Sequence, residues 1–198
     1  MLSSITPLGE RSRGNRWWTT VLAYLVGSVL GGAATGLVLG ALGVPLRRAG
    51  LTGATLAVVV ATVAAVALAF DGFASRLRLP RSKRQVNEDW ISIYRGWVYG
   101  FGWGFQLGLG WTTIVTAALI YLVFVLALLS GSVWMGLAIV ATFGLIRGLV
   151  ILAAARVHDP EQLVAFHRRL QRDAPIARAA TVMADLFVVV VAVVVAVR

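Results

Sequence analysis

The chain has 198 residues, of which 59% are hydrophobic and only 13% are charged, and its mean hydropathy is +0.86. Soluble domains carry about 25% charged residues, so this composition excludes a soluble fold and indicates an integral membrane protein. The chain contains no cysteine, which excludes disulfides, thiolate metal sites and thiol redox chemistry among its own residues.

Long charge-poor stretches predict five membrane spans, because about 20 apolar residues suffice for one spanning helix. The expected spans cover residues 17–44, 51–70, 97–129, 133–155 and 176–197. We therefore expect an all-α fold, a polytopic membrane helical bundle. Residues 1–198 are expected to form a single integral membrane domain.

The basic residues between these spans are distributed unevenly. With five spans, 14 of the 18 Lys and Arg residues fall on the side of the N-terminus. The other side holds Arg47, Arg48 and Arg198, and Arg147 lies within a span. Because cytoplasmic loops carry the excess of basic residues, the N-terminus is predicted to be cytoplasmic. The loop of residues 71–95 is then cytoplasmic and the turn of residues 130–132 is external.

The net charge of +10 does not indicate a nucleic-acid-binding protein, because the basic residues follow the span boundaries. We expect them to face a lipid bilayer with an anionic inner leaflet. Seventeen of the 18 basic residues are Arg, and Ala, Val and Gly are abundant, which is typical of a GC-rich bacterial genome. The expected location is a bacterial inner (cytoplasmic) membrane.

Glycines recur every four residues in the first and third expected spans. Small residues at this spacing form a flat strip on which another helix can approach closely. The pattern predicts helix packing, against this chain, a second copy of it or another membrane protein. The strips contain Gly32, Gly36 and Gly40 in the first span and Gly100, Gly104 and Gly108 in the third.

The third span is too long to cross a bilayer directly. Residues 96–129 would form a helix of about 51 Å at 1.5 Å per residue, against a hydrocarbon core of about 30 Å. The segment must tilt, protrude or break, and its glycine-dense part at residues 96–110 is where a break is most easily accommodated. At its beginning, an aromatic belt at the membrane surface is expected from Trp90, Tyr94, Trp97 and Tyr99.

Two short amphipathic helices are expected on the cytoplasmic surface. The first begins near Asn87, where acidic residues occupy the first turn. The second begins at Asp159, with Pro160 in its first turn and Gln162 as a capping partner. Both are predicted to lie along the anionic inner leaflet. A surface for docking another protein is the alternative.

Three polar residues are predicted to share one depth in the membrane. Gln106, Arg147 and Asp185 each lie nine residues from an expected cytoplasmic boundary, which places them about 13 Å deep. One interpretation is a structural ion pair of Arg147 and Asp185, with Gln106 satisfying further donors. Another is a substrate or ion pathway that also includes Thr112, Thr113 and Thr116. In a third, Arg147 extends unpaired toward the surface.

Other chemistry is nearly absent from the sequence. His158 and His167 lack metal-ligand spacing, so neither a metal site nor a cofactor is expected. No nucleophile elbow and no pair of catalytic carboxylates is visible, and we therefore do not expect an enzyme.

Two segments carry a family resemblance. The stretch GLGWTTIVT at residues 108–116 and the stretch FGLIRGL at residues 143–149 resemble the transmembrane domain of the cytochrome c biogenesis and thiol-disulfide transporter family, CcdA and DsbD-like. That family has a glycine-rich helix entering a Trp-Thr-Pro-Cys type motif. Here Thr113 and Ile114 replace its Pro-Cys pair, so electron relay through thiols is excluded. The family's six spans in two inverted halves also differ from the five expected here. The resemblance implies a related helical scaffold that moves a small solute or supports another membrane protein.

Two functions follow from these observations. The first is a transporter-like protein that binds or passes a small anion or polar solute at the level of Gln106, Arg147 and Asp185. The second is a non-catalytic subunit or assembly factor of a larger membrane complex. A water-accessible cavity around the three polar residues would favour the first function. Sealing by protein contacts would favour the second.

Overall fold

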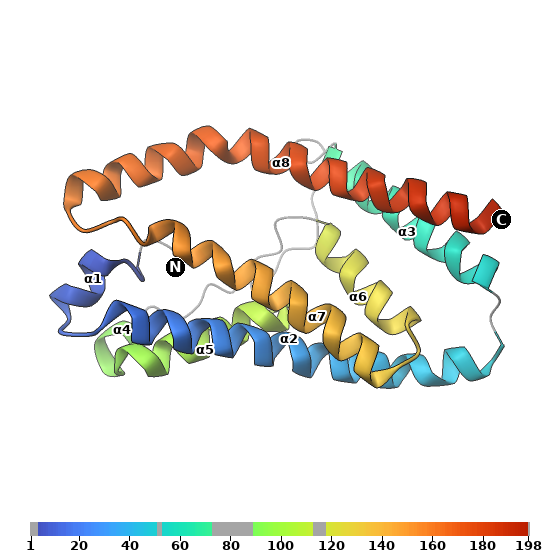
Figure 1. The fold of residues 1–198 in the computed structure, drawn as a ribbon, viewed down its shortest axis with the longest axis horizontal. Coiled ribbons are helices and arrows are strands. Elements are labelled where there is room, and N and C mark those ends of the chain that lie inside the picture. Colours follow the sequence, from blue (N-terminus) through green and yellow to red (C-terminus); the bar gives the residue numbers. More distant parts are fainter. Residues whose placement is uncertain (1–3, 51–52, 73–88, 113–117, 198) are drawn as a thin grey trace. The chain divides into compact units, whose positions relative to one another are not determined.

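A computed structural model describes residues 4–50, 53–72, 89–112 and 118–197. These residues form helices and connecting segments, with no strand among them (Figure 1). In chain order, the helices are α1 (Pro7–Ser12), α2 (Trp17–Arg48), α3 (Gly53–Gly72), α4 (Trp90–Ile93), α5 (Gly96–Leu109), α6 (Leu119–Leu129), α7 (Val133–Leu149), the 3-10 helix η1 (Val150–Ala154) and α8 (Pro160–Val197). The expected all-α fold is confirmed.

Within the described residues, four helical segments are long and apolar enough to cross a membrane. They are α2, α3, α7 with η1, and α8, and they overlap the first, second, fourth and fifth expected spans. The second expected surface segment is not a separate short helix. It is continuous with the fifth span, because α8 runs through Pro175 without ending. Of the first surface segment, the described part is the four-residue helix α4.

The third expected span is broken. Helix α5 ends at Leu109, and the C-cap residue Gly110 has a φ of 79°, in the left-handed region that favours glycine. Helix α6 begins at Leu119 and has only 11 residues. The break therefore lies at the end of the glycine-dense part of the span, and each of the two helices is shorter than a membrane crossing requires.

The chain divides into two compact units. Unit 1 comprises Met1–Ala33, Lys83–Thr113 and Ala141–Ala174, and unit 2 comprises Ala34–Ser82, Ile114–Val140 and Pro175–Arg198. Helices α2, α7 and α8 each contribute residues to both units. The single domain over residues 1–198 stays a prediction.

One face of α2 exposes large apolar side chains, while polar side chains of the same helix are buried. On α2, Leu22, Val26 and Leu30 are about half exposed and recur every four residues, so they share one face. Thr20 and Ser28 of the same helix are buried. This distribution suits a helix that meets lipid on one side and protein on the other, because lipid tails are as apolar as leucine.

In unit 1, α5 packs in parallel along α2 through glycine. A Cβ at Gly100 would lie 2.6 Å from the carbonyl oxygen of Thr20, and one at Gly104 would overlap the carbonyl of Tyr24. One turn further, a Cβ at Gly108 would overlap the carbonyl of Ser28. The two backbones are in direct contact, so no larger residue fits at these three positions without displacing a helix.

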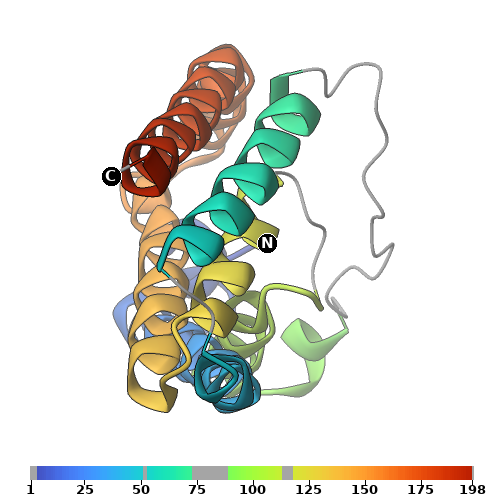
Figure 2. The same ribbon diagram turned by 90° about the vertical axis from the view of Figure 1, so that its right-hand side faces the viewer.

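In unit 2, α7 packs antiparallel to the second half of α2. A Cβ at Gly40 would lie 2.5 Å from the carbonyl oxygen of Ser132, and Gly36 meets the backbone of Gly136 one turn further along α7. The turn from α6 into α7 contains Gly131, whose φ is 55°. Helix α3 packs against α6 in the same unit, as Figure 2 shows.

Candidate functional site

A buried carboxylate joins α1, α2 and α5 in unit 1. Glu10 is fully buried, and one of its oxygens accepts hydrogen bonds from Arg13 at 2.6 Å and from the hydroxyl of Tyr99. Its other oxygen accepts from the Thr20 hydroxyl at 2.7 Å. Asn15 donates to the Tyr99 hydroxyl at 3.4 Å. The charge is thus paired and hydrogen-bonded on both oxygens, as a buried carboxylate requires.

The surroundings of this Glu10 cluster reinforce it. Burial lowers the pKa of Arg13, but hydrogen bonds and charges from Glu10 and Tyr99 outweigh burial and raise the pKa above its usual value. Arg13 therefore stays charged at every ordinary pH. Gly96 leaves the necessary space, because a Cβ there would lie 2.5 Å from Thr20 Oγ1 and 3.0 Å from Glu10 Oε2.

The sequence-based expectation for Tyr99 is wrong. It was expected in the interfacial belt, but its side chain is fully buried in a core with Trp17, Tyr24 and Trp103. Tyr94 and Trp97 are about half exposed, as belt residues would be. Sequence reasoning missed Glu10 because it lies among arginines before the first span. One pattern in the sequence could have predicted the ion pair: Glu10 is a single acid that lies one helical turn before the basic residue Arg13.

The C-terminal end of α5 is satisfied by two polar side chains. The Thr112 hydroxyl donates to the carbonyl of Gln106 at 2.6 Å, and Arg147 Nη1 donates to the carbonyl of Leu107 at 3.2 Å. The last carbonyls of a helix have no partner within it, and they attract positive charge. Arg147, from α7, therefore occupies the position where a cation stabilises a helix that ends within the span.

The N-terminal end of α6 is satisfied by a carboxylate. Asp71, in the last turn of α3, accepts from the amide of Ala118 at 2.8 and 2.9 Å and from that of Leu119 at 3.3 Å. Arg178 of α8 donates to the main-chain carbonyls of Asp71 at 3.2 Å and Gly72 at 2.9 Å. Each interrupted helix end thus meets a side chain of the charge that its dipole favours.

Asp71 was expected to begin a cytoplasmic loop, but only 4% of it is exposed. One feature of the sequence could have indicated that Asp71 is buried, because it is a lone acid directly after the apolar run that ends at Phe70. The role of Asp71 as a cap depends on α6 beginning at Leu119, and no local sequence pattern predicted that helix start.

Asp185 lies on α8 in unit 2 and is fully buried. Neither of its oxygens has a hydrogen-bond partner among the residues that the structure describes. The charged side chain that acts on it is Asp71, with which it lies within range of a shared hydrogen bond. A buried acid in this position requires an explanation, because an isolated carboxylate charge is very costly to bury.

The four predicted site residues that the structure describes are distributed over both units. Gln106, Thr112 and Arg147 lie together at the end of α5 in unit 1, whereas Asp185 belongs to unit 2. Thr113 and Thr116 lie outside the described residues. Pairing of Arg147 with Asp185 and a substrate path through these residues both stay predictions.

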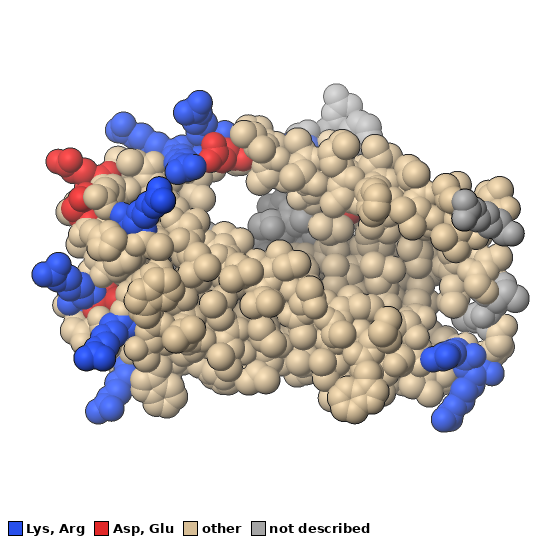
Figure 3. Space-filling model, viewed as in Figure 1, with Lys and Arg blue, Asp and Glu red and all other residues tan. Residues whose placement is uncertain are grey.

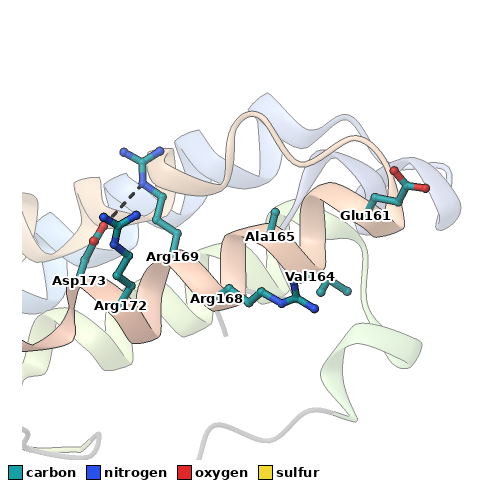
Figure 4. Close-up of a pocket in the computed structure, with 7 residues that line it drawn as sticks. All are labelled: Glu161, Val164, Ala165, Arg168, Arg169, Arg172 and Asp173. Atoms are coloured by element: carbon teal, nitrogen blue, oxygen red, sulfur yellow. Dashed lines mark ion pairs between the residues drawn. The ribbon is translucent and has the colours of Figure 1, made fainter.

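The N-terminal part of α8 carries a basic surface. A shallow hollow of about 860 Å³ there is lined by Glu161, Val164, Ala165, Arg168, Arg169, Arg172 and Asp173, all from α8 itself. Figure 4 shows the arginines extending in different directions, with Arg169 paired to Asp173 at 3.6 Å. Figure 3 shows Arg side chains, in blue, gathered over α1, over this part of α8 and at the C-terminal end of α2. Because residues of a single exposed helix cannot enclose a ligand, we interpret this hollow as part of an open basic surface and not as a binding pocket.

A second hollow, of about 430 Å³, lies between α3, α6 and α8 in unit 2 and is lined almost entirely by apolar residues, among them Leu56, Val60, Leu126 and Phe187. Neither hollow is lined by Gln106, Thr112, Arg147 or Asp185. The described residues contain no group of three or more His, Asp or Glu side chains that could hold a metal ion.

Curated relatives share similarity along most of the chain. The methylamine utilization protein MauF of Paracoccus versutus is 32% identical over 189 residues, which cover 92% of this chain and 68% of that protein. MauF of Methylophilus methylotrophus is 34% identical over 158 residues, which cover 76% of this chain and 53% of that protein. MauF of Paracoccus denitrificans is 30% identical over 186 residues, which cover 92% of this chain and 67% of that protein.

The chain spans only about half of the Methylophilus relative and about two thirds of the two Paracoccus relatives. No solved structure matches it. A family model described as the cytochrome C biogenesis protein transmembrane region matches residues 3–194, nearly the whole chain. Together with its multiple apolar helices, this match identifies a multi-pass membrane protein. The chain belongs to the family of the cytochrome c biogenesis protein transmembrane region.

Proposed function

We propose that this protein is a non-catalytic membrane accessory protein that supports methylamine utilization. The similarity to MauF over 92% of the chain carries the proposal. Of the two functions considered from the sequence, the relatives favour the accessory subunit over passage of a small anion. The absence of cysteine separates the chain from thiol electron transfer.

The contacts of the intramembrane polar residues support the same proposal. Arg147, Thr112 and Asp71 have structural roles at helix ends, so a substrate is not needed to explain their presence. Ser28 adds a contact between helices by donating to the carbonyl of Gly144 at 2.6 Å. Tight backbone packing and satisfied helix ends suit a scaffold that holds a partner in the membrane.

A chimera tests the proposal. The matching part of MauF in Paracoccus versutus is replaced by this chain, so that the remaining third of that protein is still supplied. We expect the chimera to restore growth on methylamine to a strain that lacks MauF, and growth on a non-methylated carbon and nitrogen source to be unaffected. Failure to restore growth by a chimera that is present in the membrane at the level of MauF would overturn the proposal.

Two variants of the chimera provide the control. Gly104→Ala places a methyl group on the carbonyl of Tyr24, whereas Gly53→Ala meets nothing within 4 Å. The accessory role depends on the packed scaffold, so the chimera with Gly104→Ala should support slower growth than the chimera with Gly53→Ala. Equal growth would show that the packing of α5 on α2 does not matter for the function.

We also propose that the basic surface of α8 faces anionic lipid of a bacterial inner membrane. Arg168, Arg169 and Arg172 are exposed, and each basic residue near an anionic surface contributes about 1 kcal/mol. A detergent-solubilised protein should therefore bind vesicles containing phosphatidylglycerol more tightly than vesicles of phosphatidylcholine. Replacing the three arginines with Gln should remove the difference, and persistence of the difference would refute the assignment.

A further inference from the structure

The meeting point of α3, α6 and α8 contains two acidic side chains in direct interaction. Asp71 and Asp185 are 4% and 0% exposed, and their side chains lie within range of a shared hydrogen bond. Neither oxygen of Asp185 receives a donor from the described residues. Two ionised carboxylates in such contact repel each other strongly, so one of them must be neutral.

The surroundings decide which carboxyl group is ionised. Asp71 accepts three hydrogen bonds from the amides of Ala118 and Leu119 at the positive end of α6. Amide donors favour the charged form of a carboxylate. Asp185 receives no such donor from the described residues. As a neutral acid it would have an O–H group of its own, which could donate one further hydrogen bond to Asp71.

Among the described residues, the other charged and titratable groups on α3, α6 and α8 do not change this assignment. On α8, Arg178 is bound to the main-chain carbonyls of Asp71 and Gly72. On α6, the titratable side chain within Leu119–Leu129 is Tyr121, and on α3 the charged side chain within Gly53–Gly72 is Asp71 itself. Arg178 reduces the cost of one negative charge at this point, but it leaves Asp185 without a donor.

A metal cation would be the alternative neutralising group. Hard cations such as Ca²⁺ and Mg²⁺ take about six oxygen ligands. Asp71 already directs both of its oxygens to amides, and no third acidic or histidine side chain joins the pair within the described residues. The ligand that this site can hold is therefore a proton.

We propose that Asp71 and Asp185 form a proton-binding site, in which Asp185 carries the proton and donates it to the carboxylate of Asp71. The bound proton joins α8 to the junction of α3 and α6. In the unfolded chain at neutral pH an exposed Asp185 is ionised, so folding takes up one proton at this residue. Raising the pH therefore disfavours the folded state, and lowering it toward mild acidity favours the folded state.

Infrared spectroscopy of the purified full-length protein tests the proposal. A protonated carboxylic acid gives a carbonyl stretching band distinct from that of a carboxylate. We expect this band at neutral pH in the wild type, and we expect slow exchange of its proton in deuterated water because the site is fully buried. The band should be absent from Asp185→Asn and retained in Asp173→Asn, which changes an exposed aspartate of the same helix.

Thermal unfolding provides the second measurement. The midpoint of the wild type should fall as the pH is raised from 6 to 9, whereas Asp185→Asn, whose amide can donate to Asp71 permanently, should show a smaller fall. If Asp185→Asn does not fold, the wild-type spectrum alone decides. A wild type without the protonated band at neutral pH overturns the proposal, as does a band that Asp185→Asn retains. These measurements do not involve methylamine growth, so they are independent of the proposed function.

Discussion

At the scale of single residues, three charged side chains within the described helical core have defined contacts. Glu10 is bound by Arg13, Thr20 and Tyr99, and Arg147 and Asp71 satisfy helix ends. Hydrogen bonds to charged groups contribute about 1.5 to 3 kcal/mol, more than those between neutral groups. The polar residues of this protein therefore contribute to its stability through specific geometry.

Tyr99→Phe tests the Glu10 cluster. The change keeps the buried ring but removes the hydroxyl that donates to Glu10, so we expect a loss of about 1 to 3 kcal/mol in unfolding free energy. Tyr94→Phe is the matched control, because Tyr94 is about half exposed. Unfolding in detergent, followed by circular dichroism, measures both. Equal stability of the two variants would contradict the role assigned to the cluster.

The predicted pairing of Arg147 with Asp185 has its own test. If they form an ion pair, Arg147→Ala and Asp185→Ala should each destabilise the protein more than the double substitution does, because the double substitution leaves no uncompensated charge, and the coupling should be about 1 kcal/mol. If Arg147 instead acts at the end of α5 and Asp185 with Asp71, the two losses should add. A double-mutant cycle in detergent distinguishes these outcomes, and a clear coupling would count against the shared proton.

At the scale of helices, glycine determines which helices meet. Glycine strips on α2 and α5 bring the two backbones together, and Gly36 and Gly40 do the same for α2 and α7. Helix α2 therefore packs with α5 in unit 1 and with α7 in both units. Backbone contact of this kind leaves no room for even one methyl group.

Gly108→Ala is the test at this scale. Its Cβ would overlap the carbonyl of Ser28, so the helices must separate, and we expect a loss of about 1 to 3 kcal/mol, as for other overpacked sites. Gly53→Ala should be neutral or slightly stabilising, because its surroundings are open and alanine favours the helix. Thermal midpoints in the same detergent provide the comparison. A neutral Gly108→Ala would refute close packing of α5 on α2.

The sequence could predict these strips, because their four-residue spacing is local information. It could also predict that the third span would not cross as one straight helix, since its length exceeds the membrane. It could not predict which side chains satisfy the broken ends. Asp71 and Arg147 are 47 and 40 residues from the groups they bind, and such pairings depend on tertiary packing. The same reason explains why Tyr99 was misplaced at the surface.

At the scale of the whole molecule, the charge distribution predicts one orientation in the membrane. Cysteines introduced at Ser82 and Ser132 of this cysteine-free chain test it. An impermeant thiol reagent applied to spheroplasts should label position 132 and leave position 82 unlabelled until the membrane is opened, because basic segments stay cytoplasmic. The wild type, without any thiol, is the control. Labelling of position 82 but not of position 132 would show that the protein has the opposite orientation.

As the proposed accessory protein, the chain should not itself move a solute. Flux into liposomes that contain only the purified chain measures this, with radiolabelled methylammonium, chloride and sulfate as probes. We expect uptake no faster than into empty liposomes for all three. Saturable uptake of any probe, lost in Arg147→Ala while the variant remains folded, would contradict the accessory role and favour a transporter.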